Sequence, residues 1–112
     1  MKVITAIIRV GELDDVTRAL IKAGARGVTV TEARGFGQQF GHAQEHYPVE
    51  RAALLLPKLR IDVLVHDQDA AAVADAIAKS VRTGAIGDGK IWVCPVAGAL
   101  RVRTGERDDD AV

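Results

Sequence analysis

Residues 58–65 read Lys-Leu-Arg-Ile-Asp-Val-Leu-Val, and polar and apolar side chains alternate along most of this stretch. A period of two is typical of a β-strand with one buried face. Residues 70–81 then repeat apolar side chains at helical spacing, between an expected N-cap at Asp69 and a closing Gly84. Residues 90–96 are again rich in strand-forming side chains. These segments predict a β-α-β unit.

The N-terminal third of the chain predicts a second unit of the same kind. Residues 3–10 are mostly β-branched and predict a strand, and residues 12–23 follow with a helical period, acidic side chains in the first turn and Gly24 at the end. Residues 26–34 alternate again and predict another strand. The order of elements in this part is therefore also β-α-β.

Two such units in one antiparallel sheet predict an α+β protein, a ferredoxin-like βαββαβ sandwich with both helices on one sheet face. A long irregular stretch, residues 37–56, separates strands two and three. Residues 100–103 predict a short terminal strand, and residues 106–112 an acidic, frayed tail. The sheet face without helices needs cover, which another copy of the chain would supply.

Length and charge restrict the class of protein. The chain has 112 residues, 48% of them apolar, which predicts one domain over residues 1–112. Fifteen basic and fifteen acidic residues cancel, so no overall field attracts nucleic acid or an anionic membrane. No apolar run approaches the roughly 20 residues that span a bilayer, and we expect a cytoplasmic protein. The single Cys94 has no internal disulfide partner and is expected to be buried.

Residues 84–90 contain the pattern Gly-x-x-x-x-Gly-Lys, the first part of a nucleotide-binding P-loop. The match fails, because Ile91 replaces the required hydroxyl residue and the segment leads from a helix to a strand. Three glycines still allow backbone N–H groups to converge beside Lys90, which predicts an anion-binding loop. Arg101 and Arg103, two apart on the expected strand, would share a face and suit phosphate. A flexible turn with a surface lysine is the alternative.

Two further patterns mislead. Arg34-Gly35-Phe36-Gly37 copies half of an RNA-recognition signature, but the third strand, where its aromatic side chains belong, contains none. His42-Ala43-Gln44-Glu45-His46 spells an inverted zinc-protease motif, but it lies in a glycine-containing irregular stretch without a third ligand. We expect neither RNA binding nor a metalloprotease centre.

Taken together, the motifs resemble those of PII signal-transduction proteins over the whole chain. The matching stretches are Leu13-Asp14-Asp15-Val16, Gly27-Val28-Thr29-Val30-Thr31-Glu32, Gly35-Phe36-Gly37-Gln38-Gln39, Gly41-His42, Leu56-Pro57-Lys58, Arg82-Thr83-Gly84, Ile86-Gly87-Asp88-Gly89-Lys90-Ile91 and Arg101-Val102-Arg103-Thr104-Gly105-Glu106. The resemblance implies a homotrimer with ATP or ADP in each cleft between neighbouring subunits.

The resemblance also implies the ligand-binding residues. Those for the nucleotide are Thr29, Gly37, Gln39, Leu64, Gly87, Asp88, Gly89, Lys90, Arg101 and Arg103. Those for 2-oxoglutarate, which in this family binds alongside ATP and Mg²⁺, are Gln39, Gly41, Lys58 and Gly87, with Gln39 completing the metal coordination. An amide oxygen is a plausible protein ligand, because Mg²⁺ takes about six oxygens and draws most of them from phosphates and small ligands.

Residues 37–56 correspond to the family's T-loop, which docks into partner proteins. The implied partner contacts are Phe40, His46, Tyr47, Glu50 and Arg51. Many members carry a modifiable tyrosine where this chain has Arg51, so no uridylylation is expected there, and Tyr47 is the alternative acceptor. Members that plug ammonium channels often have arginine where this chain has Tyr47. Asp62 replaces the usual glutamate.

Three functions are compatible with these residues. The first is a non-enzymatic sensor of ATP, ADP and 2-oxoglutarate that regulates a nitrogen- or carbon-metabolism enzyme or a membrane transporter. The second is an adenylate-binding regulator with a different effector or partner. The third is a slow ATPase, which is disfavoured because no pattern supplies a positioned base or nucleophile.

Overall fold

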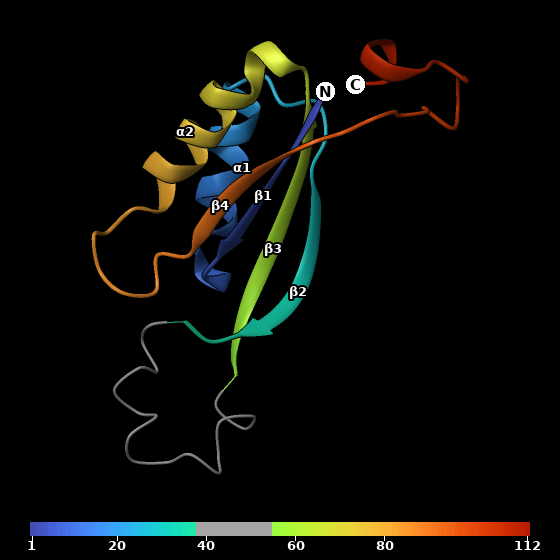
Figure 1. Cartoon of the computed structure of the whole chain (residues 1–112). Helices are drawn as coiled ribbons and strands as arrows, with labels where there is room; N and C mark the ends of the chain where they lie inside the picture. Colours follow the sequence, from blue (N-terminus) through green and yellow to red (C-terminus); the bar gives the residue numbers. More distant parts are fainter. Residues whose placement is uncertain (38–54) are drawn as a thin grey trace.

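The computed structural model describes residues 1–37 and 55–112. Figure 1 shows the main elements in chain order: β1 (Lys2–Ile8), α1 (Leu13–Lys22), β2 (Thr29–Gly35), β3 (Leu56–Val65), α2 (Ala70–Val81) and β4 (Lys90–Pro95). Three short 3₁₀ helices accompany them: η1 (Val10–Glu12), η5 (Asp67–Asp69) and η6 (Asp108–Ala111). Most of the expected T-loop, including Gln39, Phe40, Gly41, His42, His46, Tyr47, Glu50 and Arg51, lies outside the described residues.

The four strands form one antiparallel sheet in the order β2-β3-β1-β4. The central strand β1 pairs with β3 on one side, where Ile4 faces Val63, and with β4 on the other, where Ala6 faces Ile91. The α+β class, the two helices and the antiparallel sheet are confirmed. The strand order is that of a ferredoxin-like sandwich, in which each β-α-β unit skips one strand.

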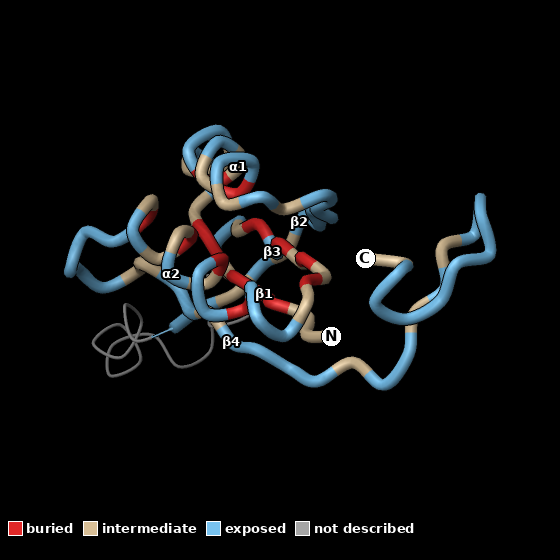
Figure 2. The backbone as a smooth tube through the Cα atoms, turned by 90° about the horizontal axis from the view of Figure 1, so that it is seen from above, coloured by how far each residue is buried: buried red, intermediate tan, exposed pale blue. Residues whose placement is uncertain are grey.

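Both helices pack on the same face of the sheet, as the red, buried segments of Figure 2 indicate. Helix α1 contributes Val16 and Leu20 to this core, and α2 contributes Val73, Ile77 and Val81. The facing strand residues are Ile4, Ala6, Ile8, Leu59, Ile61, Val63 and Val65. The buried residues of β3 alternate as predicted, because successive side chains of a strand point to opposite faces.

The start of α2 differs from the sequence prediction. Asp69 occupies the N-cap position, but its side chain makes no capping hydrogen bond. Asp69 is also the last residue of η5, and its backbone angles are helical. A side-chain cap needs an extended N-cap residue whose oxygen can reach the first free N–H groups. The predicted capping contact is therefore wrong, although the helix begins where expected.

Among the residues that the structure describes, no helix covers the opposite face of the sheet. Thr5 of this face is buried and donates a 2.6 Å hydrogen bond to Asp62, which also accepts a 3.0 Å bond from Arg60. Trp92 and Cys94 of β4 lie on the same face and are exposed. The prediction of a buried Cys94 is therefore wrong for the single chain, because β4 is an edge strand and this face is uncovered. None of the described helices is both long and apolar enough to cross a membrane.

The C-terminal segment also differs from the prediction. Leu100 makes only an isolated bridge with Arg107, and the residues between them form a turn in which Gly105 N–H donates to Arg101 O over 2.8 Å. The predicted strand over residues 100–103 is therefore wrong. The segment expected to fray, residues 106–112, contains η6, and Figure 1 shows this C-terminal arm, residues 96–112, extending beyond the sheet.

Candidate functional site

A hollow of about 540 Å³ lies at one end of the sheet, beside the loop that joins α2 to β4. It is bounded by the ends of β1, β2 and β3 and by that connecting loop. Its described lining residues are Ile7, Gly35, Phe36, Gly37, Lys58, Ala85, Ile86, Gly87, Asp88, Gly89 and Lys90. The structure therefore brings together Gly37, Lys58 and residues 87–90, all of which the sequence nominated.

The loop over residues 82–89, here called the glycine loop, depends on glycine at fixed positions. Gly84, Gly87 and Gly89 all have positive φ, between 83° and 102°. At Gly89 an added Cβ would lie 1.9 Å from the carbonyl oxygen of Ile7, which no side chain tolerates. The glycine loop therefore lies directly on β1, with a backbone conformation that L side chains rarely adopt.

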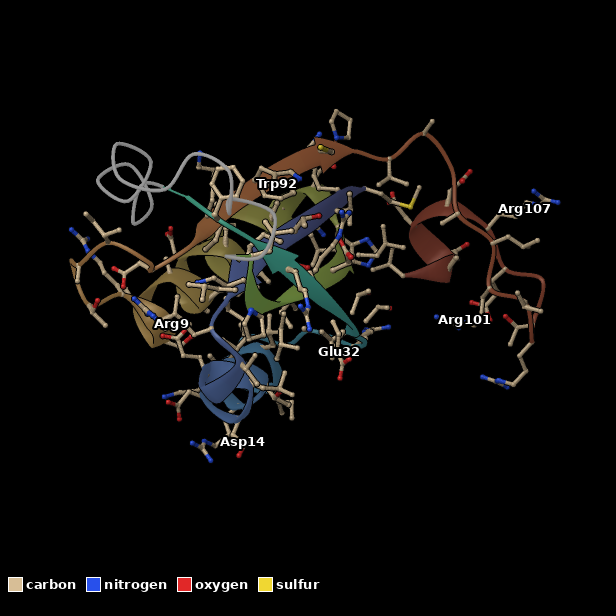
Figure 3. All side chains as sticks on the ribbon, turned by 90° about the horizontal axis from the view of Figure 1, so that it is seen from below. Arg9, Asp14, Glu32, Trp92, Arg101 and Arg107 are labelled. Carbon is tan, nitrogen blue, oxygen red and sulfur yellow. The ribbon has the colours of Figure 1, made fainter. Side chains whose placement is uncertain are left out.

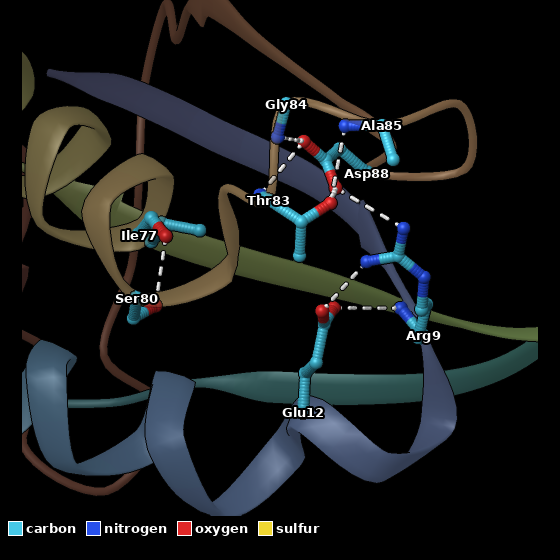
Figure 4. A network of polar contacts seen from close by, with 8 residues as sticks. All are labelled: Arg9, Glu12, Ile77, Ser80, Thr83, Gly84, Ala85 and Asp88. Atoms are coloured by element: carbon cyan, nitrogen blue, oxygen red, sulfur yellow. Dashed lines mark hydrogen bonds and ion pairs between the residues drawn. The ribbon is translucent and has the colours of Figure 1, made fainter.

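The carboxylate of Asp88 fixes the beginning of the glycine loop (Figure 4). Its Oδ2 accepts hydrogen bonds from the backbone N–H of Thr83 at 2.9 Å and of Gly84 at 2.8 Å. Its Oδ1 accepts a hydrogen bond from the Thr83 hydroxyl. One side chain therefore satisfies three donors just beyond the end of α2, and it closes the loop into a compact turn.

Arg9, just after β1, contacts Oδ1 of this carboxylate, the oxygen that also accepts from the Thr83 hydroxyl. Its Nη2 donates to Asp88 Oδ1 at 3.1 Å, while its Nη1 donates to Glu12 Oε1 at 2.8 Å. The hydrogen bond from the Thr83 hydroxyl lowers the pKa of Asp88 far below its ordinary value, and the Thr83 and Gly84 amides and Arg9 add to this effect. Asp88 is consequently ionised throughout the physiological range.

Two lysines contribute positive charge to the hollow. Lys58 is half-buried on β3, opposite Ala33 of β2, and Lys90 begins β4 opposite Ile7 of β1. Backbone amides of a glycine-rich turn with nearby cations favour an anionic ligand. In the described part of the chain, no group of three or more His, Cys, Asp or Glu side chains forms a metal site.

Of the other nominated residues that the structure describes, Leu64 lies toward the opposite end of the sheet and Thr29 lies level with its middle. Thr29 pairs with Asp62, and Leu64 pairs with Val3 near the start of β1. Lys58 and Leu64 are six residues apart on one strand, a separation of about 20 Å. The C-terminal arm begins at this same end, where the Val96 N–H donates to Met1 O over 3.1 Å.

Arg101 and Arg103 belong to that arm, in the turn rather than on a strand. The Arg101 guanidinium donates to Glu106 and to the carbonyl of Val112, each at 3.3 Å, and Arg103 is exposed. The inference that the two guanidiniums share a strand face therefore fails. Figure 3 shows Arg101 and Arg9 at opposite ends of the molecule, so a single chain does not bring the arginines of the arm to the glycine loop.

Sequence reasoning missed Arg9, Glu12 and the anchoring role of Thr83. Arg9 and Asp88 are 79 positions apart, and no local pattern connects them. The sequence also left Asp62 as a shorter substitute for a glutamate near the nucleotide. In the structure its carboxylate is engaged by Arg60 and Thr5; burial raises the pKa of Asp62, but these hydrogen bonds outweigh burial and lower it.

The fold and the glycine loop define a small ferredoxin-like protein with an anion-compatible hollow at its rim. The family model described as "Nitrogen regulatory protein P-II" matches residues 1–106. The chain is 46% identical to "Nitrogen regulatory protein P-II" of Rhizobium meliloti (strain 1021) and to "Nitrogen regulatory protein P-II 1" of Escherichia coli (strain K12). It is 45% identical to "Nitrogen regulatory protein GlnK" of Escherichia coli (strain K12). Each comparison covers 112 residues and the full length of both chains.

The chain therefore belongs to the P-II family of nitrogen regulatory proteins. The resemblance found in the sequence is confirmed, and membership supports a role as a signalling regulator that acts on partner proteins.

The close approach of Gly89 to β1 predicts a difference between two alanine substitutions. Gly84→Ala and Gly89→Ala both introduce backbone strain of about 1 to 2 kcal/mol. Only Gly89→Ala adds a clash, with the Ile7 carbonyl, worth about a further 1 to 3 kcal/mol. Urea unfolding of both variants measures the difference, and equal losses of unfolding free energy would show that the loop does not lie against β1.

The low pKa of Asp88 predicts a pH-dependent contribution to stability. Folding favours the ionised carboxylate, so its contribution is complete above the ordinary pKa of 3.8 and is lost as the pH falls below that value. Asp88→Asn should therefore lower the melting temperature most at pH 7, and the gap from the unsubstituted protein should shrink between about pH 4 and pH 2. Thermal unfolding across this range tests the assignment, and a gap independent of pH would contradict it.

Proposed function

We propose that the protein is a sensor of ATP or ADP and of 2-oxoglutarate that regulates a nitrogen- or carbon-metabolism enzyme or a transporter through residues 37–56. The observation that carries this proposal is the hollow beside the glycine loop, where backbone amides and Lys90 lie next to Lys58. Phosphates suit the amides and Lys90, and a second anion suits Lys58.

A homotrimer would complete the site. Of the residues nominated for adenine, Leu64 lies toward the end of the sheet from which the C-terminal arm extends and Thr29 lies level with the middle, whereas the glycine loop lies at the other end. If adenine binds at one end and the phosphates at the other, a neighbouring chain must supply one of the two groups. The sheet face without helices, with exposed Trp92, is the surface available for that contact.

The effector site is proposed at the same hollow. Lys58 would pair with the distal carboxylate of 2-oxoglutarate, with Gly41 and Gly87 beside the ligand. Mg²⁺ would be held by phosphate oxygens and Gln39, since it takes about six oxygen ligands. Asp88 fits a structural role better than metal coordination, because its carboxylate already accepts hydrogen bonds from Thr83, Gly84 and Arg9.

Regulation would follow from the position of the hollow at the base of residues 37–56. Gly37 lines the hollow directly, so a bound ligand would contact the segment that is proposed to dock with the partner. A ligand shifts only the equilibria between states that it binds with different affinity. ADP lacks the γ-phosphate and would not support 2-oxoglutarate, so the partner would respond to both energy state and carbon supply.

The alternatives use the same hollow. A regulator with a different effector would still bind the nucleotide at the glycine loop, but Lys58 would not pair with the carboxylate of 2-oxoglutarate. A slow ATPase would need a base beside the phosphates, but the one carboxylate among the described lining residues is Asp88, which is held by Arg9 and the loop. A non-enzymatic role is therefore the better supported proposal.

The effector proposal predicts a specific calorimetric pattern. With Mg²⁺ present, 2-oxoglutarate should bind when ATP is added and should give no heat when ADP replaces it. Lys58→Ala should weaken this binding by about tenfold or more, because a charge-assisted contact to a carboxylate is lost. Lys79→Ala, a change on α2, is the matched control and should bind normally. Normal affinity in Lys58→Ala would remove that lysine from the effector site.

The proposed homotrimer predicts the mass of the protein in solution and a contribution of the C-terminal arm to ATP binding. Light scattering should report three times the 11.9 kDa of one chain. Arg103→Ala should leave this mass unchanged, since the side chain is exposed in the single chain, and should weaken ATP by about 1.5 to 3 kcal/mol. A monomer, or an unchanged ATP dissociation constant, would contradict the proposed shared site.

A further inference from the structure

The contact between Arg9 and Asp88 joins the end of β1 to the glycine loop from outside the loop. The three charged side chains involved are shielded without being fully buried: 33% of Arg9, 17% of Glu12 and 23% of Asp88 is exposed. Arg9 Nη2 also lies 3.3 Å from the position that a Cβ on Gly87 would occupy, so the guanidinium lies against the backbone of the loop. Figure 4 shows the contacts of Arg9 with Glu12 and Asp88.

The ionised Asp88 creates an electrostatic conflict in a loop that favours anions. The loop requires this carboxylate, because it accepts hydrogen bonds from Thr83 and Gly84 at 2.8 to 2.9 Å. The same negative charge lines the hollow and would repel a phosphate there. A neighbouring cation reduces this repulsion only if it remains paired with the Asp88 carboxylate.

Glu12 holds Arg9 in that position. Its Oε1 accepts from Arg9 Nη1 at 2.8 Å, and its Oε2 accepts from the backbone N–H of Arg9 at 3.1 Å. Because the planar guanidinium is fixed through Nη1 by Glu12, its Nη2 is directed at Asp88. The order Glu12–Arg9–Asp88 therefore runs from the start of α1 to the loop, as a chain of charge-assisted hydrogen bonds.

We propose that Arg9 is a positioning residue for phosphate binding: it neutralises and orients Asp88, so that the glycine loop presents its amides to a polyphosphate without a competing negative charge. The proposal deepens the nucleotide site and rests on the proposed function. It assigns Arg9 no contact with the ligand, because both ends of its guanidinium are already engaged by carboxylates.

The test is a double-mutant cycle read by ATP titration in the presence of Mg²⁺. Arg9→Met should raise the ATP dissociation constant by about tenfold, because Asp88 is left uncompensated. In the Asp88→Asn background the same substitution should change the constant by less than about twofold, since no carboxylate remains to be neutralised. Arg18→Met is the matched control, because Arg18 pairs with Asp15 on the exposed side of α1, and it should bind ATP normally.

Two further measurements separate positioning from general destabilisation. Arg9→Lys keeps the positive charge and should restore most of the ATP affinity lost in Arg9→Met. In the ligand-free protein, amide hydrogen exchange at Thr83 and Gly84 should be faster in Arg9→Met than in Arg18→Met, because the carboxylate that accepts these N–H groups is held less firmly.

Each outcome decides the proposal. An Arg9→Met effect that persists undiminished in the Asp88→Asn background would mean that Arg9 contacts the phosphate directly, and it would overturn the positioning role. Unchanged ATP binding in Arg9→Met would overturn the proposal while leaving the nucleotide-binding function intact. Failure of the unsubstituted protein to bind ATP would refute the proposed function itself, and the assignment of phosphate binding to this loop would fall with it.

Discussion

The hydrogen bonds accepted by the Asp88 carboxylate hold together the end of the sheet where the hollow lies. This carboxylate joins the beginning of the glycine loop, through Thr83 and Gly84, to Arg9 at the end of β1. Without it, three donors beyond the end of α2 would have to be satisfied by water, and glycine φ angles alone would not select one loop conformation. The loop reaches the hollow in a defined shape because one ionised side chain satisfies donors from three residues.

The close approach at Gly89 complements this anchor. The backbone of the loop lies against the carbonyl of Ile7, which brings Lys90 beside β1 and starts β4 in register with that strand. The core under the sheet contributes by packing β1 and β3, the two central strands, against both helices. The hollow therefore combines rigid strands on one side with a hydrogen-bonded turn on the other, which is a suitable base for a ligand-binding site.

The residues nominated for ligand binding do not lie together in one chain. The glycine loop and Lys58 lie at one end, Thr29 lies level with the middle, and Leu64 lies toward the other end, where the arm that carries Arg101 and Arg103 begins. A sheet of this length separates the two groups within one chain. The substitution of Asp62 for glutamate is also easier to interpret in the structure, because Arg60 and Thr5 of the same chain already engage its carboxylate.

Sequence patterns alone predicted the β-α-β repeats, the core face of α2, the glycines of the loop and the family; in α1, Ile21 has the helical spacing of the core residues but is exposed. These properties follow from local periodicity and from motifs whose residues are contiguous, so they can be recognised without coordinates. Tertiary structure alone decided the contact of Arg9 with Asp88, the turn at residues 101–105 in place of a strand, and the exposure of Cys94 on an edge strand. The Arg9–Asp88 contact and the edge position of β4 depend on which distant segments meet, and strand propensity or spacing carries no information about that. The turn forms because residues 100–107 bond to one another and, among the described residues, to no strand of the sheet.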